Sequence, residues 1–338
     1  MSPSRMQVLI TGCYRSGTEY VTLLLNNHPD LAATMYVVNF MRFCYDRYNP
    51  IEVEQNYSKL IFDAAERIRL RWRRNVDVHS ILDVCNSTEK VTYALLYDLL
   101  MADLFLKEDG KAWAEKTQLV WTRIPAFLGM FPAGKVIHVV RDPRSVLASF
   151  KKFTYAPEPA YLGAIFNCYD SMKSGLQFKS EFPENRYHLL KYEDVVNSPR
   201  ETLTRLFDFL GFHVEHDLLS EKDWKDPLGN PWNHNSAFAP KDAAPSRFDK
   251  QAAVSRWEKN LSEDEISTCE CVNSELMKTY GYERSGIIPD WVATLKMLLS
   301  DERLAFYLKR WATDGRGVEE FPTDPINPAN WEDSSTPK

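Results

Sequence analysis

A short loop near the amino terminus has the residue types that bind an anion. Residues 12–18 read Gly-Cys-Tyr-Arg-Ser-Gly-Thr and lie between an apolar run and a helix-like pattern. Glycines let the backbone approach a phosphate closely, and the N–H groups at a helix N-terminus point toward an anion that the helix dipole favours. Arg15 adds a cation to this loop. We therefore expect a phosphate-binding loop, with a plain strand-to-helix turn as the alternative.

The spacing of the two glycines leaves the class of nucleotide open. Gly12 and Gly17 are spaced as in the loop that binds nucleoside triphosphates, G-x-x-x-x-G-K-[ST]. However, Thr18-Glu19 stands where that loop has Lys followed by Ser or Thr, and Glu19 is a poor neighbour for a γ-phosphate. The pattern weakens an ATPase or kinase interpretation without removing it.

A second segment, residues 136–149, combines an apolar strand with two arginines. It reads Val-Ile-His-Val-Val-Arg-Asp-Pro-Arg-Ser-Val-Leu-Ala-Ser. Arg141 would lie at the carboxyl edge of the sheet, where α/β folds bind ligands, and a guanidinium matches phosphate oxygens bidentately. One alternative is a magnesium-binding strand end at Asp142, which the flanking arginines and Pro143 disfavour. Another is pairing of both arginines with surface acids, and we expect Arg144 to face solvent more readily than Arg141.

The elements around these segments follow a strand-helix order. Strands are expected at residues 6–11, 135–140 and 186–191. Helices are expected at residues 18–27, 57–74, 90–106, 144–153, 160–181, 199–210 and 263–280. This order predicts an α/β fold, a parallel β-sheet flanked by helices on both faces.

Taken together, these segments resemble the sulfotransferases that use 3′-phosphoadenosine 5′-phosphosulfate (PAPS), especially the tyrosylprotein and bacterial small-molecule branches. The resemblance covers about residues 6–282. Its motifs are Arg15-Ser-Gly-Thr18 followed by His28-Pro29, the segment from Arg141 to Ser149, Trp113-Ala-Glu-Lys116-Thr-Gln, and Tyr192-Glu-Asp194. It implies the P-loop-like sulfotransferase fold and transfer of a sulfuryl group from PAPS to a hydroxyl, amine or guanidine nitrogen of a small-molecule acceptor, giving PAP.

The resemblance also implies roles for individual residues. Arg15 would hold the bridging and sulfuryl oxygens, and Lys116 would contact the transferring group, so both would be catalytic. The remaining cofactor contacts would come from Ser16, Gly17, Thr18 and Glu19 at the 5′-phosphate, from Arg141 and Ser149 at the 3′-phosphate, and from Tyr20 and Tyr192 beside the adenine. Asn235-Ser236 would belong to a mobile loop over the cofactor. This chemistry requires no metal.

The general base is missing from both positions at which the family places it. Cytosolic members have a His two residues after the matched lysine, where this chain has Gln118. Tyrosylprotein and heparan-type members have a Glu shortly after His-Pro, where this chain runs Ala-Thr-Met-Tyr-Val-Val-Asn over residues 33–39. The other candidates are His79, Asp77, Asp46 and Glu115, and each is expected to be structural. The base is therefore unassigned, and a nitrogen acceptor would need it less.

Net charge, apolar segments and cysteine spacing limit the classes of partner and the cellular compartment that we expect. A net charge of −6 argues against a nucleic-acid partner. No signal peptide or apolar run of membrane length appears, and the six cysteines show no metal or redox spacing, so we expect a cytoplasmic protein with reduced thiols and no membrane partner. Either a monomer or a homodimer is compatible with the sequence.

Two expectations concern the domain division and a basic run. We expect one domain over residues 1–312 and a Pro- and acid-rich tail over residues 313–338. The arginines of residues 67–74 are expected on a solvated helix face paired with acidic neighbours or the tail, with binding of an anionic partner as the alternative. The competing functional interpretations are a P-loop kinase that uses ATP and a degenerate protein that binds nucleotide without catalysis.

Overall fold

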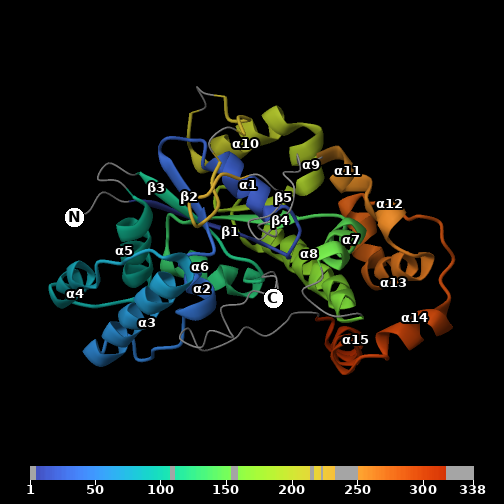
Figure 1. Ribbon diagram of the computed structural model, residues 1–338, viewed down its shortest axis with the longest axis horizontal. Coiled ribbons are helices and arrows are strands. Elements are labelled where there is room, and N and C mark those ends of the chain that lie inside the picture. Colours follow the sequence, from blue (N-terminus) through green and yellow to red (C-terminus); the bar gives the residue numbers. More distant parts are fainter. Residues whose placement is uncertain are drawn as a thin grey trace.

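A five-stranded parallel sheet forms the centre of the molecule (Figure 1). The computed structural model describes residues 5–106, 111–153, 159–213, 217–221, 224–232 and 250–316. The strand order is β2-β3-β1-β4-β5. The strands are β1 (Met6–Gly12), β2 (Leu31–Met35), β3 (Ala112–Lys116), β4 (Lys135–Val140) and β5 (Tyr187–Lys191). The predicted parallel α/β sheet is confirmed.

The three strands expected from the sequence are present, and two more were not foreseen. β1, β4 and β5 match the expected strands to within one residue at each end. β2 has the sequence Leu-Ala-Ala-Thr-Met and β3 has Ala-Trp-Ala-Glu-Lys. Neither is rich in the β-branched residues that mark strands. β3 is completely buried between β1 and β2 nonetheless, so its place in the sheet comes from tertiary packing.

Helices cover both faces of the sheet (Figure 1). Those near the sheet are α1 (Thr18–Leu25), α6 (Ile124–Met130), α7 (Pro143–Phe153), α8 (Gly163–Glu181), α9 (Tyr192–Asn197) and α10 (Pro199–Leu210). Those between β2 and β3 are α2 (Phe40–Phe43), α3 (Glu54–Trp72), α4 (Val78–Asn86) and α5 (Tyr93–Phe105). The last five are α11 (Lys250–Ser255), α12 (Trp257–Asn260), α13 (Glu263–Tyr280), α14 (Trp291–Leu298) and α15 (Glu302–Asp314).

Alternate residues of the strands enter two separate cores. Val8 and Ile10 of β1 pack in one core with α1 and α10. Leu9, between them, packs in the larger core, which includes residues of α3, α5, α6 and α8. This alternation follows from the two-residue period of a strand, and it explains why both faces of the sheet need helices.

Some expectations fall at the edge of the described residues. Helix α15 continues through Asp314, so the first two residues of the expected tail are helical. Residues 317–338 and Asn235-Ser236 lie outside the described residues, and the division at residue 312 stays a prediction. In the part of the chain that is described, no helix has the length and apolar character needed to span a membrane.

Candidate active site

The loop between β1 and α1 lies at the carboxyl edge of the sheet and is held by its own backbone. Ser16 donates from its backbone N–H (3.2 Å) and from its hydroxyl (2.7 Å) to the carbonyl oxygen of Cys13. Arg15 has φ 66° and Gly17 has φ 93°, so the chain turns through the left-handed region twice. Turns of this kind, together with the free N–H groups at a helix N-terminus, form anion-binding concavities in many proteins. Binding of a phosphate at this loop stays a prediction.

Gly17 is required by a close approach as well as by its φ angle. A Cβ atom at this position would lie 2.1 Å from Cδ2 of the Tyr192 ring. Tyr192 is fully buried at the start of α9, directly after β5, and its ring packs against the loop at Gly17. Burial raises the pKa of Tyr192 to about 12, against the opposing effect of Arg141. Its predicted contact with adenine stays a prediction, because here the ring faces Gly17 and Arg141.

The arginines of the two motifs meet at this edge. The Arg15 side chain donates from Nε to the hydroxyl oxygen of Ser149 at 3.0 Å. Arg141 donates from Nη1 to the carbonyl oxygen of Arg15 at 2.8 Å and from Nη2 to that of Ala253, and its guanidinium lies 4.5 Å from the centre of the Tyr192 ring. Arg15 thus lies in one cluster with Arg141 and Ser149, which come from a segment more than 120 residues later in the sequence. The roles of the three residues toward the two phosphates stay predictions.

Arg144 does not face solvent, contrary to the sequence expectation. It is 3% exposed and forms a salt bridge with Asp142 at 2.7 Å and another with Glu270 of α13 at 2.8 Å. Its guanidinium also lies 3.9 Å from the Trp257 ring centre. The expectation was wrong because the partner acid, Glu270, comes from a helix more than a hundred residues away. Arg144 therefore anchors the turn that carries Arg141.

Lys116 lies at the end of β3 in a buried polar group that we call the Lys116 cluster: Glu19, Tyr36, Lys116 and Gln118. The Lys116 ammonium lies 3.5 Å from the centre of the Tyr36 ring and 3.9 Å from Oε1 of Glu19. The Tyr36 hydroxyl donates a hydrogen bond to the same Glu19 oxygen, and Nε2 of Gln118 lies 3.4 Å from the Tyr36 hydroxyl. The side chain of Lys116 has no exposed surface, and that of Glu19 is 13% exposed.

The basic run on α3 is only partly the solvated face that was expected. Arg69 is exposed and pairs with Glu66 at 2.7 Å, as expected. Arg67 is 2% exposed, donates to the carbonyl oxygens of Val37 and Val38, and lies over the Phe43 ring. Burial of Arg67 corrects that expectation, because the chain after β2 supplies backbone acceptors that the sequence does not reveal. Arg67 thereby fixes the segment that follows Tyr36.

Sequence reasoning missed several residues beside Tyr20. The Tyr20 ring packs edge-on against Tyr192 and against Trp224, and the Lys250 ammonium lies 4.9 Å from its centre. Burial raises the pKa of Tyr20, and Lys250 opposes this. Arg256 lies near enough to Tyr192 to oppose the rise in that residue's pKa, after Arg141. Trp224, Lys250 and Arg256 belong to no motif, so no sequence pattern could have identified them.

The other base candidates occupy structural positions. Asp77 caps α4 by accepting from the backbone N–H of Ser80, and Asp46 accepts from Asn49 on the surface. His79 is exposed. Glu115 is fully buried, where it accepts from the backbone N–H of Asn39 and Phe40 and from the Tyr97 hydroxyl, and burial raises its pKa. These contacts fit the structural roles expected for Asp77, Asp46 and Glu115, and the role of His79 stays a prediction.

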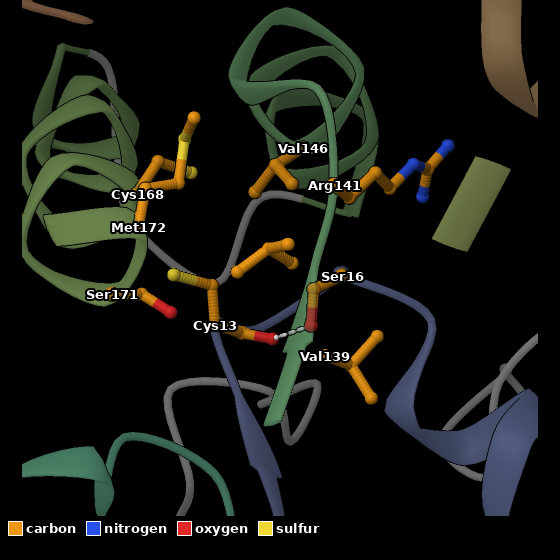
Figure 2. A pocket seen from close by; sticks show the side chains of 9 residues that line it. Cys13, Ser16, Val139, Arg141, Val146, Cys168, Ser171 and Met172 are labelled. Atoms are coloured by element: carbon orange, nitrogen blue, oxygen red, sulfur yellow. Dashed lines mark hydrogen bonds between the residues drawn. The ribbon is translucent and has the colours of Figure 1, made fainter. Parts of the chain in front are cut away.

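A small cavity lies behind the loop, between β4, α7 and α8 (Figure 2). It measures about 10 Å³, room for one water at most. Its lining is mainly apolar and includes Cys13 and Cys168. Interaction with the Cys13 thiol, together with burial, raises the pKa of Cys168. In Figure 2 the guanidinium of Arg141 extends away from the cavity. The cavity is a packing void and is too small for a nucleotide.

A family match decides the identity of this fold. The profile described as "Sulfotransferase family" matches residues 7–216, which include the loop, Lys116 and the Arg141 strand. The chain belongs to the sulfotransferase family. Carbohydrate sulfotransferase 1 of Danio rerio is 25% identical over 167 residues, which cover 44% of this chain and 38% of that protein. This sulfotransferase thus matches less than half of the length of that relative.

Solved structures support the fold assignment. The sulfotransferase domain from the curacin biosynthetic pathway superimposes with a TM-score of 0.52 at 18% identity, covering 83% of this chain and 99% of that one. The sulfotransferase domain from the Synechococcus PCC 7002 olefin synthase does so with a TM-score of 0.52 at 20% identity, covering 84% and 97%. At such identities the likeness establishes the sulfotransferase fold, and the acceptor has to be inferred from this chain's own residues.

Proposed function

We propose that this sulfotransferase takes a sulfuryl group from PAPS and delivers it to a hydroxyl, amine or guanidine nitrogen of a small molecule in the cytoplasm. The observation that carries the proposal is the Arg15–Ser149–Arg141 cluster, which joins the two phosphate motifs at one edge of the sheet. A donor with phosphates at both its 5′ and 3′ positions fits two neighbouring cationic sites. The six free cysteines fit a reducing compartment.

Buried polar atoms near this cluster support a polar ligand. Among the described residues, Arg141 Nε and the Tyr192 hydroxyl are buried and have no hydrogen-bond partner. Such atoms are costly unless a ligand or water satisfies them. A 3′-phosphate beside Arg141 would accept from Nε, and Arg256 and Lys250 add positive charge on the same side. The donor set therefore fits a bisphosphorylated adenosine.

The proposed chemistry assigns distinct work to the two catalytic cations. Arg15 and the loop N–H groups would bind the 5′-phosphosulfate, which is charged before the reaction begins. Lys116 would stabilise the negative charge that grows on the bridging oxygen as the sulfur–oxygen bond breaks. Sulfuryl transfer, like phosphoryl transfer, depends mainly on positioning and charge neutralisation, which this set of residues can supply.

Calorimetry with PAP, ATP and AMP in the absence of magnesium tests the proposal. Because the paired cationic sites suit two separate phosphates, PAP should bind more tightly than AMP and more tightly than ATP. Tighter binding of ATP than of PAP would instead support a P-loop kinase. A protein that binds PAP but transfers no label from ³⁵S-PAPS would support a non-enzymatic nucleotide binder.

A further inference from the structure

The Lys116 cluster contains a hydroxyl–carboxylate pair at the place where the family's usual bases are absent. Tyr36 directly follows β2, and Glu19 lies in the first turn of α1. Lys116 ends β3, and Gln118 lies two residues beyond it. The strands β2 and β3 are neighbours in parallel register, with Met35 opposite Lys116, so their carboxyl ends deliver these side chains to one point. The pair therefore adjoins the lysine that contacts the transferring group in the proposed reaction.

The backbone of Tyr36 is strained. Its φ angle is 70°, in the left-handed region that bulky residues avoid. Such strain costs about 1–3 kcal/mol and occurs preferentially at functional sites. Arg67 holds the next two carbonyl groups, and Trp72 stacks on the Tyr36 ring with centroids 6.3 Å apart. The surrounding structure thus enforces this orientation of the phenol.

The hydrogen bonds of Tyr36 have the direction that a proton relay needs. Its hydroxyl donates to Glu19, so the proton already points toward the carboxylate. A hydroxyl oxygen has two acceptor lone pairs, so the oxygen that Gln118 reaches can also accept a proton from a nucleophile. The Lys116 ammonium lies close to both the Tyr36 ring and the Glu19 carboxylate. Its positive charge stabilises negative charge on the phenol oxygen as the proton moves.

We propose that Tyr36 is the catalytic base of the sulfuryl transfer and that Glu19 receives the proton through it; this rests on the proposed function. The nucleophile's lone pair attacks sulfur and forms the new bond. The bond from sulfur to the bridging oxygen breaks, and its electron pair stays on the 5′-phosphate of PAP. The nucleophile's proton passes to Tyr36 Oη while the Tyr36 proton passes to Glu19. After product release the two steps reverse, and the proton leaves to water.

Three variants test the relay. Tyr36→Phe keeps the ring against Lys116 and Trp72 but removes the hydroxyl, and Glu19→Gln keeps an acceptor for Tyr36 but cannot hold the proton. Tyr48→Phe is the matched control, because Tyr48 forms another buried tyrosine–carboxylate pair, with Asp63 at 2.8 Å. With enzyme in excess, loss of label from ³⁵S-PAPS to water and to added phenol gives a single-turnover rate without knowledge of the natural acceptor.

The relay predicts three linked results. Tyr36→Phe and Glu19→Gln each lower the transfer rate about 10²-fold, the scale of general base catalysis. The double variant is no slower than either single variant, because the two residues act as one unit. Calorimetry shows unchanged PAP affinity for Tyr36→Phe and tighter PAP binding for Glu19→Gln, because a carboxylate beside the phosphate site has lost its charge. A merely structural pair would lower binding and transfer together.

The outcomes separate the relay from the proposed function. Transfer rates of both single variants equal to that of Tyr48→Phe, or losses that multiply in the double variant, overturn the relay. Wild-type protein that binds PAP but transfers label to neither water nor phenol also overturns it, because a poised base activates such nucleophiles. Wild-type protein that does not bind PAP refutes the donor itself and therefore the proposed function.

Discussion

At the scale of single residues, Lys116 is a fully buried cation that two neighbouring groups compensate. A lysine without exposed surface is costly unless its charge is compensated. Here the Tyr36 ring and the Glu19 carboxylate lie within 4 Å of its ammonium. The sequence pointed to Lys116 through the family motif, whereas Tyr36 carries no motif and became visible only through its contacts.

Replacement of Lys116 by Ala should separate binding from chemistry. Charge on the bridging oxygen grows mainly in the transition state, so the variant should lose about 10²-fold in single-turnover rate at saturating PAPS. PAP affinity should change little. Lys116→Arg should recover only part of the rate, because a planar guanidinium cannot copy a compact ammonium. Unchanged turnover in Lys116→Ala would remove this residue from the catalytic set.

Arg141 should discriminate between nucleotides with and without a 3′-phosphate. Arg141→Ala should weaken PAP binding by about 1.5–3 kcal/mol, the contribution of a charge-assisted hydrogen bond. The affinity for AMP should fall less, because AMP has no 3′-phosphate for Arg141 to contact. The variant affects AMP only indirectly, through loss of the hydrogen bond from Arg141 to the Arg15 carbonyl in the loop. Calorimetry with both ligands measures the difference. Equal losses would mean that Arg141 supports the loop and does not bind the 3′-phosphate.

At the scale of elements, the fit between the loop and α9 should be sensitive to one methyl group. Gly17→Ala places a Cβ against the Tyr192 ring and forces alanine to φ 93°, so it should cost about 1–3 kcal/mol and abolish PAP binding. Gly129→Ala is the control, because open space surrounds that helical glycine. It should be neutral or slightly stabilising. Urea unfolding and calorimetry report both effects, and equal behaviour of the two variants would contradict the packing argument.

The elements also show what sequence patterns can and cannot predict. β1 and β4 are apolar runs bounded by loop residues, so their positions followed from composition, and the parallel sheet followed from the strand-helix order. β2 and β3 were not predicted, because Ala-Ala and Glu-Lys are not typical of strands. The two strands form through pairing with strands distant in the chain. Arg15, Arg141 and Ser149 were found by motif, whereas Trp224, Lys250 and Arg256 converge on Tyr20 and Tyr192 through tertiary structure.

At the scale of the whole molecule, a buried histidine should link stability to pH. His138 of β4 has no exposed surface, and its ring nitrogens lie 2.8 Å from the hydroxyls of Tyr187 and Ser171. Burial lowers the pKa of His138 from 6.5 to about 3. Between these values the unfolded chain binds a proton that the folded chain does not. The contribution of neutral His138 to the free energy of unfolding is therefore fully present above pH 6.5 and is lost progressively as the pH falls toward 3.

His138→Gln should flatten this dependence. Between pH 7.5 and pH 5 the wild type should lose about 2 kcal/mol more than the variant, at 1.36 kcal/mol per pH unit. Urea unfolding at the two pH values measures the free energy of unfolding of both proteins. Both contain the same carboxylates, so the contribution of carboxylate titration cancels when the two pH dependences are subtracted. Burial also lowers the pKa of His188, so part of the slope should survive in the variant. Parallel stability curves would show that His138 does not titrate as described.

The strand order has a consequence for how this enzyme can diversify. Residues assigned to the donor nucleotide come from two separate stretches, on β1–α1 and from β4 to α12. Tyr36, together with Arg67 and Trp72, which hold its orientation, comes from one unbroken stretch, from β2 at the edge of the sheet through α5. Glu19 and Lys116, which also contact it, come from α1 and β3. Exchange of that single stretch, by recombination or by design, would alter which nucleophile reaches the sulfur and leave Arg15 and Arg141 in place. Under the proposed function, such a division would let acceptor choice evolve while the donor stays constant.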